Sequence, residues 1–295
     1  MIKLSIITIN YNNAEGLRKT MESVLAQTYT EIEYIIVDGA STDGSVDVIR
    51  ELATRPTIKW VSEKDTGIYN AMNKGIRMAT GEYIEILNSG DILAADDVTE
   101  RMFQAMGYGQ WAIDNENNRQ SPMANRPQIP IFYGNMIKEY PDGRRVVDRC
   151  QAKGYTPESF YYFYRGTLNH DCAYIRRDLF EKYGLYNEEM KICSDWEWYV
   201  RAIVLGGEKT VYANIDVTVF DMTGISESNG KNQDIILKER REYLESILPA
   251  SVLRDYNMYS LPIEQYRRLK KYHLWGVVYF VERVLFKFEK WFRKR

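Results

Sequence analysis

The sequence predicts an α/β protein with a mostly parallel central sheet flanked by helices and followed by a helical C-terminal extension. Within residues 3–91, short apolar runs rich in β-branched residues alternate with segments of helical periodicity. Such alternation is typical of parallel sheets joined by right-handed crossovers. Apolar residues also recur at helical spacing near the C-terminus, between basic and aromatic residues, which predicts the extension.

The predicted elements follow one another in regular order. Strands are expected over residues 3–9, 34–37, 58–62 and 81–87, with helices over 14–27, 45–53 and 67–79 between them. The second half is less regular. Its expected strands are 131–135, 145–148, 172–175 and 211–219, its helices are 178–183, 195–205 and 234–248, and polar stretches at 110–130 and 223–232 are expected to be loops.

Every early strand ends in polar residues, namely Asn10-Tyr11, Asp38, residues 63–65 and residues 88–91. In parallel α/β sheets ligands bind beside the carboxyl ends of the strands. We therefore expect a binding site at this edge. The alternative for each segment taken alone is a turn or a helix cap, since Asn, Asp and Gly favour both.

Composition excludes several classes of protein. The chain has 295 residues and a net charge of −2, so no overall field attracts nucleic acid. With three cysteines and two histidines and no CxxC spacing, a zinc site is not expected. No apolar run reaches the ~18 residues of a membrane span. Met1-Ile2-Lys3 leads directly into a strand, so we expect no signal peptide and a cytoplasmic protein.

Four segments together carry a family resemblance: residues 4–12 (LSIITINYN), 35–45 (IIVDGASTDGS), 67–75 (GIYNAMNKG) and 87–91 (LNSGD). As a set they resemble the family 2 glycosyltransferases, which use the GT-A fold, and more specifically the bacterial enzymes that build exopolysaccharide or antigen repeat units. The resemblance implies a catalytic domain over residues 1–225, in which 1–105 bind a nucleotide sugar and 106–225 bind the acceptor. Residues 226–295 then form the helical extension.

The resemblance also implies an inverting transfer from a nucleoside-diphosphate sugar, with a UDP-sugar expected first, to a glycan or lipid-linked acceptor. Tyr11 is expected to stack on the base, and Asp38 to accept its N–H. Further donor-binding candidates are Thr8, Asn10, Asp65, Asn73 and Lys74. The alternatives are a packed loop aromatic for Tyr11, a turn residue for Asp38 and a solvated surface charge for Lys74.

Family members hold a divalent cation with an Asp-x-Asp motif, and Mg²⁺ or Mn²⁺ suits such oxygen ligands. Here the motif is Asn88-Ser89-Gly90-Asp91. Asp91 is therefore the expected metal ligand, and Asn88 is expected near the ribose or a metal-bound water. One carboxylate of the usual pair is missing, which leaves strict metal dependence open.

The segment Ser194-Asp195-Trp196-Glu197 occupies the position at which the family places its acceptor base. Asp195 would take the proton of the acceptor hydroxyl, Ser194 would cap the helix, and Trp196 or Trp198 would line the acceptor sugar. His170 is a further candidate near the donor or the acceptor. The structural alternatives are a favourable charge at the helix start for Asp195 and an ordinary hydrogen-bonding role for His170.

Competing functions differ in what they require. No glycine-rich phosphate loop follows the first strand, which argues against a nucleotidylyltransferase or a Rossmann dehydrogenase. A glycosidase built on Asp91 and Asp195 would leave the nucleotide-site motifs unused. A catalytically degenerate nucleotide-sugar-binding protein of the same fold remains the main alternative.

The C-terminal segment, residues 266–295, predicts attachment to an anionic membrane surface. Apolar and aromatic residues recur at helical spacing, and basic residues crowd both ends of the segment. A helix of this kind suits the membrane interface, at the inner face of the cell membrane. The alternative is that it packs on protein.

Overall fold

The computed structural model describes residues 2–107, 129–149, 156–222, 232–272 and 275–292. The chain forms two compact units, Met1–Glu239 and Arg240–Arg295. The polar segments expected as loops at residues 110–130 and 223–232 fall almost entirely outside the described residues. Each unit is considered by itself.

The first unit is built on one sheet, which within the described residues has the strand order β3-β2-β1-β4-β8-β6-β9-β5, with β7 paired to β6. The first four strands pair in parallel, as predicted. The sheet becomes mixed beyond them, because β8 runs antiparallel to both β4 and β6. The strands are β1 (Leu4–Asn10), β2 (Ile32–Asp38), β3 (Ile58–Ser62), β4 (Tyr83–Ile86), β5 (Ile92–Leu93), β6 (Ile131–Glu139), β7 (Arg145–Asp148), β8 (Ala173–Arg176) and β9 (Thr210–Asp221).

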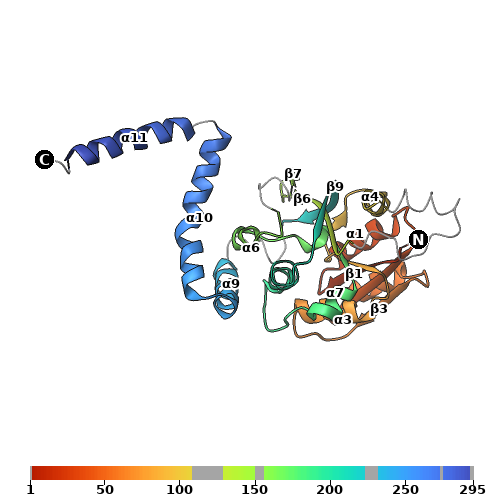
Figure 1. Ribbon diagram of the computed structural model, residues 1–295. Helices are drawn as coiled ribbons and strands as arrows, with labels where there is room; N and C mark the ends of the chain where they lie inside the picture. The colour runs from red at the N-terminus through yellow and green to blue at the C-terminus, as the bar shows by residue number, and fades with distance from the viewer. Residues whose placement is uncertain (1, 108–128, 150–155, 223–231, 273–274, 293–295) are drawn as a thin grey trace, which may run out of the picture. The chain divides into compact units, whose positions relative to one another are not determined.

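Helices cover both faces of this sheet, with α1 and α4 on one side and α3 on the other (Figure 1). The helices of the first unit are α1 (Ala14–Leu25), α2 (Ser45–Leu52), α3 (Ile68–Met78), α4 (Val98–Ala105), α6 (Phe160–Arg165), α7 (Asp178–Tyr183) and α8 (Ser194–Tyr199), which a π-helical turn (Val200–Leu205) extends. The predicted helices and strands of the first ninety residues are present, with ends displaced by about two residues. The short elements β5, α4 and α6 were not expected.

The central strands form because their side chains are apolar on both faces. Every residue of β1 is buried, and β2 is buried from its second residue onward, as expected for parallel strands between two helical layers. α1 begins where the Asn13 side chain accepts the Gly16 N–H at 3.1 Å, a regular N-cap. The sheet therefore presents its carboxyl edge at the starts of α1, α2 and α3.

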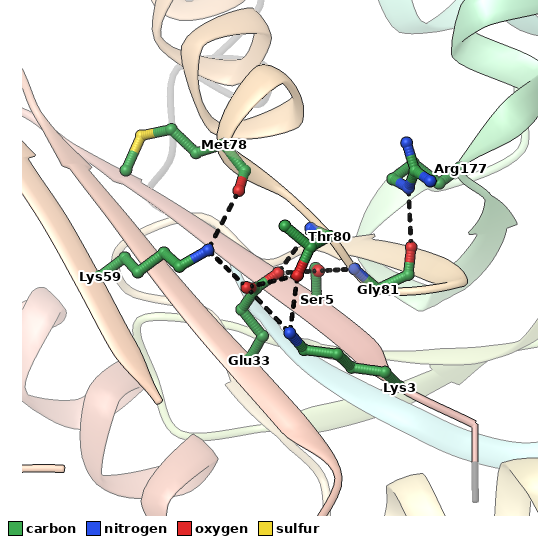
Figure 2. Close-up of polar contacts among 8 residues, drawn as sticks. All are labelled: Lys3, Ser5, Glu33, Lys59, Met78, Thr80, Gly81 and Arg177. Carbon is green, nitrogen blue, oxygen red and sulfur yellow. Dashed lines mark hydrogen bonds and ion pairs between the residues drawn. The ribbon is translucent and has the colours of Figure 1, made fainter. Parts of the chain in front are cut away.

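A buried carboxylate joins the opposite, amino-terminal edge of the same strands. Glu33 of β2 is 3% exposed and accepts hydrogen bonds from Ser5 at 2.6 Å, Lys59 at 2.7 Å and the Thr80 backbone at 2.7 Å (Figure 2). Burial alone would raise the pKa of Glu33, but these donors hold it far below its ordinary value. Gly81 completes the cluster, since a Cβ there would lie 2.7 Å from the Ser5 nitrogen.

The second unit is helical, as predicted for the extension. α9 (Gln233–Ile247) begins in the first unit and continues into the second, where α10 (Ala250–Lys271) and α11 (Trp275–Phe292) follow. Among the described residues, no helix combines the length and the apolar composition that crossing a membrane requires. The structure does not describe the side chains of the basic residues predicted to flank α11.

Candidate active site

The carboxyl ends of β1 and β2 are held together by Asp38. Asn10 and Asp38 are register partners, and the Asn10 amide donates to Asp38 Oδ1 at 2.8 Å. Ser41 Oγ donates to the same oxygen at 2.6 Å, while Ser62 Oγ and the Ser41 N–H donate to Oδ2 at 2.6 and 3.0 Å. Burial would raise the pKa of Asp38, but these donors keep it below the ordinary value.

The prediction that Asp38 meets the nucleotide base directly therefore needs correction. The side chain is fully enclosed, and a base could reach it only by displacing one of its hydrogen bonds. Asp38 instead positions Asn10 and the loop that follows β2. Asn10 keeps a buried amide oxygen that has no hydrogen-bonding partner among the described residues, so it remains a candidate for ligand binding.

Tyr11 and Asp65 lie together beside Gly39, at the mouth of this edge. A Cβ on Gly39 would lie 2.6 Å from Asp65 Oδ2 and 3.1 Å from the Tyr11 ring, so a larger residue there would displace these side chains. The Tyr11 side chain is 68% exposed. An exposed ring beside a carboxylate offers a stacking surface and a hydrogen-bond acceptor for a planar heterocycle.

Three other predicted donor-binding residues lie elsewhere. Thr8 is buried, and its hydroxyl bonds the Tyr34 hydroxyl at 2.9 Å, because its position along β1 directs it into the helical layer. Asn73 is buried and holds the backbone of Tyr186 with both amide atoms, at 2.9 and 3.0 Å. Lys74 pairs with Glu63 at 2.8 Å. Thr8 and Asn73 thus support the fold rather than face a ligand.

Asp195 lies in the first turn of α8, as predicted, and two side chains from distant parts of the chain meet it. Tyr69 of α3 places its hydroxyl 3.1 Å from Asp195 Oδ1, and His170 places Nδ1 3.2 Å from Asp195 Oδ2. The N-cap residue of α8 is not the predicted Ser194. Cys193 occupies the N-cap position, and Ser194, the first helical residue, has a buried hydroxyl that accepts and donates no hydrogen bond within the described chain.

Asp195 and His170 form an ion pair at neutral pH. Burial alone would lower the pKa of His170, but the hydrogen bond and charge of Asp195 raise it to about 9. Burial would likewise raise the pKa of Asp195, yet His170 and the Tyr69 hydroxyl keep it below the ordinary value. The side chains remain 17% and 14% exposed, so a small part of each is open to solvent. The pair therefore presents an ionised carboxylate that a substrate can approach.

Asn88, the first residue of the motif at residues 88–91, lies next to His170. Its amide nitrogen lies 3.1 Å from His170 Nε2, while its buried Oδ1 has no hydrogen-bonding partner among the described residues. When the side-chain amide of Asn88 is rotated by 180°, its Oδ1 accepts the Nε2 proton of the His170 imidazolium. Asn88, His170 and Asp195 then form one line of hydrogen bonds.

Asp91, the last residue of the same motif, is buried. Its Oδ1 accepts the Asp221 backbone N–H at 3.0 Å. Burial and the neighbouring Asp171 carboxyl raise the pKa of Asp91 well above its ordinary value, and burial also raises that of Asp171. A cation bound beside these two carboxyl groups would favour their ionised forms and lower both pKa values.

A divalent cation fits these residues only in combination with a substrate. In the described part of the chain no three His, Cys, Asp or Glu side chains are grouped to hold a metal. Asp91 offers one carboxylate oxygen beyond its bond to Asp221, and oxygen donors of this kind suit Mg²⁺ or Mn²⁺. The remaining ligands would have to come from a diphosphate.

Trp196, predicted to line an acceptor sugar, is part of the core. It is 1% exposed, and its indole N–H donates to the Phe163 carbonyl at 2.8 Å. Trp198 is likewise buried, donating to Gly184 at 2.7 Å and stacking on Phe180. Of the six residues of α8, Asp195 alone is not buried, and its carboxylate faces Tyr69 and His170.

Sequence reasoning missed Tyr69 and Asp171 as members of the site. Tyr69 falls within the quoted segment 67–75, and Asp171 follows His170 directly. Residue type and spacing alone do not distinguish either from a core residue. Tyr69 is 126 residues from Asp195 along the chain, so only the fold brings them together.

The family model described as "Glycosyl transferase family 2" matches residues 5–184. An uncharacterized glycosyltransferase of Mycobacterium tuberculosis is 29% identical over 227 residues, which cover 75% of this chain and 76% of that protein. A PGL/p-HBAD biosynthesis glycosyltransferase of Mycobacterium bovis is 25% identical over 241 residues, covering 80% and 81%.

Two solved structures share the fold. Staphylococcus aureus TarS 1-349 in complex with UDP-GlcNAc has a TM-score of 0.59 at 18% identity, covering 85% of this chain and 69% of that one. In the TarS 1-349 structure without a named ligand, the match spans 60% of that chain. The mannosyltransferase PcManGT of Pyrobaculum calidifontis, in complex with GDP-Man and Mn²⁺, has a TM-score of 0.53 at 19% identity, covering 74% and 56%.

Proposed function

Because this chain belongs to glycosyl transferase family 2, we propose that it is an inverting enzyme that transfers a sugar from a nucleoside-diphosphate donor to a hydroxyl group of a glycan or lipid-linked acceptor. The family model covers more than half of the chain, residues 5–184. Membership makes the protein a glycosyltransferase, and its fold is similar to the GT-A enzymes TarS and PcManGT. The finer assignments that follow are ours.

The donor is proposed to bind at the carboxyl edge of β1 to β4. Structures similar in fold hold UDP, UDP-GlcNAc or GDP-Man, and a UDP-sugar is the donor we expect first. The exposed Tyr11 ring would stack on the base, with Asp65 beside it to accept a ring N–H. The orphan amide oxygen of Asn10 supports a further contact with the ribose or base.

Asp195 is proposed to act as the acceptor base, and the single observation that carries this assignment is its pairing with His170 and Tyr69. Asp195 also accepts a backbone hydrogen bond from Trp196. Since each carboxylate oxygen has two lone pairs, these three donors leave one position for a further hydrogen bond. The acceptor hydroxyl would donate there, attack the anomeric carbon as the nucleoside diphosphate leaves, and pass its proton to Asp195. The lowered pKa of Asp195 keeps it ionised throughout the neutral range.

His170 has two proposed roles in this step. Its imidazolium holds Asp195 in one orientation through Nδ1, and its second N–H faces Asn88, on the side of the site assigned to the diphosphate. A fixed positive charge there stabilises negative charge that develops on the leaving group. A divalent cation bound by Asp91 and the diphosphate would supply further charge neutralisation.

We further propose that the second unit attaches to an anionic membrane surface at the cytoplasmic face. The described side chains of α11 include four large apolar residues with exposed fractions between 61% and 68%, namely Val277, Phe280, Leu285 and Phe286. Basic residues crowd both ends of this segment in the sequence. Each contributes ~1 kcal/mol near an anionic leaflet. Such attachment would bring the enzyme to a lipid-linked acceptor in cell-surface glycan synthesis.

Donor turnover tests the proposal against its alternative, a binding protein that has lost catalysis. Thermal unfolding with UDP-GlcNAc or GDP-mannose, with and without Mn²⁺, reports binding because a ligand stabilises only the state that binds it. Release of UDP or GDP from the same donors reports transfer to water or to an added acceptor. Binding together with release supports the enzyme. Stabilisation without release, from a panel of donors and glycan acceptors, would support the degenerate protein.

A further inference from the structure

Glu239 of α9 binds the turn that leads into the helix of Asp195. Its carboxylate accepts three successive backbone N–H groups, those of Lys191 at 2.6 Å, Ile192 at 3.1 Å and Cys193 at 3.0 Å. Successive N–H groups that converge on one anion form a nest, which favours negative charge. A side chain 46 residues further along the chain than Cys193 thus completes the start of α8.

This turn and Asp195 share the Tyr69 hydroxyl. Tyr69 Oη lies 2.5 Å from the Ile192 carbonyl oxygen and 3.1 Å from Asp195 Oδ1. A hydroxyl has one hydrogen to donate, so the two acceptors compete for it. The position of Ile192 therefore decides how much of this hydrogen bond Asp195 receives. Glu239 holds Ile192 from its other side, through the N–H.

The loop that leads into α8 begins near residues 186–188, and this end is held by α3. Asn73 fixes the backbone of Tyr186, and the Glu188 carboxylate accepts from Asn70 at 2.7 Å and from Asn73 at 2.8 Å. Those contacts anchor the loop to α3, whereas Glu239 anchors its last residues to α9. Loss of Glu239 would therefore free the end next to Asp195 while the fold of the remaining loop stays supported.

We propose that Glu239 is a positioning residue for sugar transfer, which fixes Asp195 against Tyr69 and His170 through the turn at residues 191–193. The inference rests on the proposed function, since it takes Asp195 as the base. It adds a requirement that no sequence motif indicated: α9 must be docked for the base to be correctly placed. Glu239 is the last residue of α9 that belongs to the first unit, so this contact lies within that unit.

Three variants separate this role from a general loss of structure. Glu239→Ala removes the carboxylate, and Glu239→Gln keeps its size but leaves one accepting oxygen and no charge. Glu245→Ala is the matched control, because Glu245 lies on the exposed face of the same helix. Release of UDP from UDP-GlcNAc, or of GDP from GDP-mannose, is measured with Mn²⁺ at varied donor concentration.

The expected result is a split between the kinetic constants. Glu239→Ala lowers kcat at least tenfold and leaves the donor KM within twofold, Glu239→Gln lowers kcat less, and Glu245→Ala matches the wild type. Wild-type kcat in Glu239→Ala would overturn the proposal. Equal losses in kcat and donor affinity in both Glu239 variants would overturn it as well, because they indicate damage to the whole site.

A second readout needs no turnover. The chain has two histidines, so the ring resonances of His170 can be assigned by comparison with a His170→Gln sample and titrated by NMR. If Asp195 moves away in Glu239→Ala, the pKa of His170 falls from about 9 toward its ordinary 6.5. An unchanged titration would overturn the positioning role. This titration decides the inference even if the wild type releases no nucleotide, an outcome that would count against the proposed function alone.

Discussion

Raising the pH should weaken the folded protein by removing the charge of His170. The folded-state pKa of His170 is raised from 6.5 to about 9 by Asp195. A raised pKa means that the folded state binds the proton more tightly than the unfolded chain does. The resulting stabilisation is fully present below pH 6.5 and is lost as the pH rises through 9.

The magnitude follows from the same two values. At about 1.36 kcal/mol per pH unit, the difference between 6.5 and about 9 corresponds to ~3 kcal/mol of unfolding free energy. The imidazole is 17% exposed, so solvent screens the pair only weakly. A loss of this size is a large fraction of the stability of a typical domain.

Urea unfolding followed by tryptophan fluorescence measures this free energy, because Trp196 and Trp198 are buried in the helix that carries Asp195. The unfolding free energies of wild type and His170→Gln are compared between pH 6 and pH 10. Their difference should shrink by ~3 kcal/mol over that range, since titrating groups away from His170 affect both proteins alike. His273→Gln serves as the control for removal of an imidazole. A difference that stays constant with pH would refute the ion pair.

Three further predictions concern metal, donor and membrane. Asp91→Ala should raise the Mn²⁺ concentration needed for half-maximal turnover at least tenfold. Asp38→Ala should weaken donor binding and leave the Mn²⁺ dependence unchanged. Identical Mn²⁺ curves for wild type and Asp91→Ala would exclude Asp91 as a metal ligand. Because the pKa of Asp91 is raised, Mn²⁺ should also bind more tightly as the pH rises. Tyr11→Ala should raise the donor KM ~5- to 30-fold at nearly constant kcat, as expected for loss of ~1–2 kcal/mol of stacking, and an unchanged KM would remove Tyr11 from the base site. Co-sedimentation with phosphatidylglycerol vesicles at low salt should fall sharply when Phe280 and Leu285, both exposed, are replaced together by Glu. Equal pelleting of the wild type and this double variant, or no pelleting of either, would contradict membrane attachment.

The sequence carried enough information to place the first half of the fold. Its central strands β1 and β2 are buried almost throughout and appear as apolar runs, and each helix between the strands has one apolar face. The order of strands in the second half depends on long-range pairing, such as β6 beside both β8 and β9, which no local pattern encodes. The short helices α4 and α6 were missed because six to eight residues give few periods to recognise.

The sequence predicted a candidate site at the carboxyl edge of the sheet, where several of the predicted residues lie, but the roles of individual residues were less predictable. A polar residue near a strand end looks the same whether it faces a ligand or holds the backbone. Thr8, Asn73 and Trp196 are buried with protein partners, and only the direction of each side chain reveals this. His170 and Asp195 lie 25 residues apart, and Glu239 lies 44 residues beyond Asp195, so their association depends on tertiary structure.

The central claim, that Asp195 is the acceptor base, is tested most directly by the turnover of Asp195→Asn. The amide keeps the size of the side chain and can still accept from Tyr69 or His170, but it cannot take the acceptor proton. Loss of a positioned base costs ~10²–10⁴-fold in rate. We predict a fall of that size in nucleotide release from UDP-GlcNAc or GDP-mannose, with donor binding by thermal shift nearly unchanged. If Asp195→Asn retained more than about a third of wild-type turnover, against the ~10²-fold minimum loss expected for a base, the assignment would be contradicted.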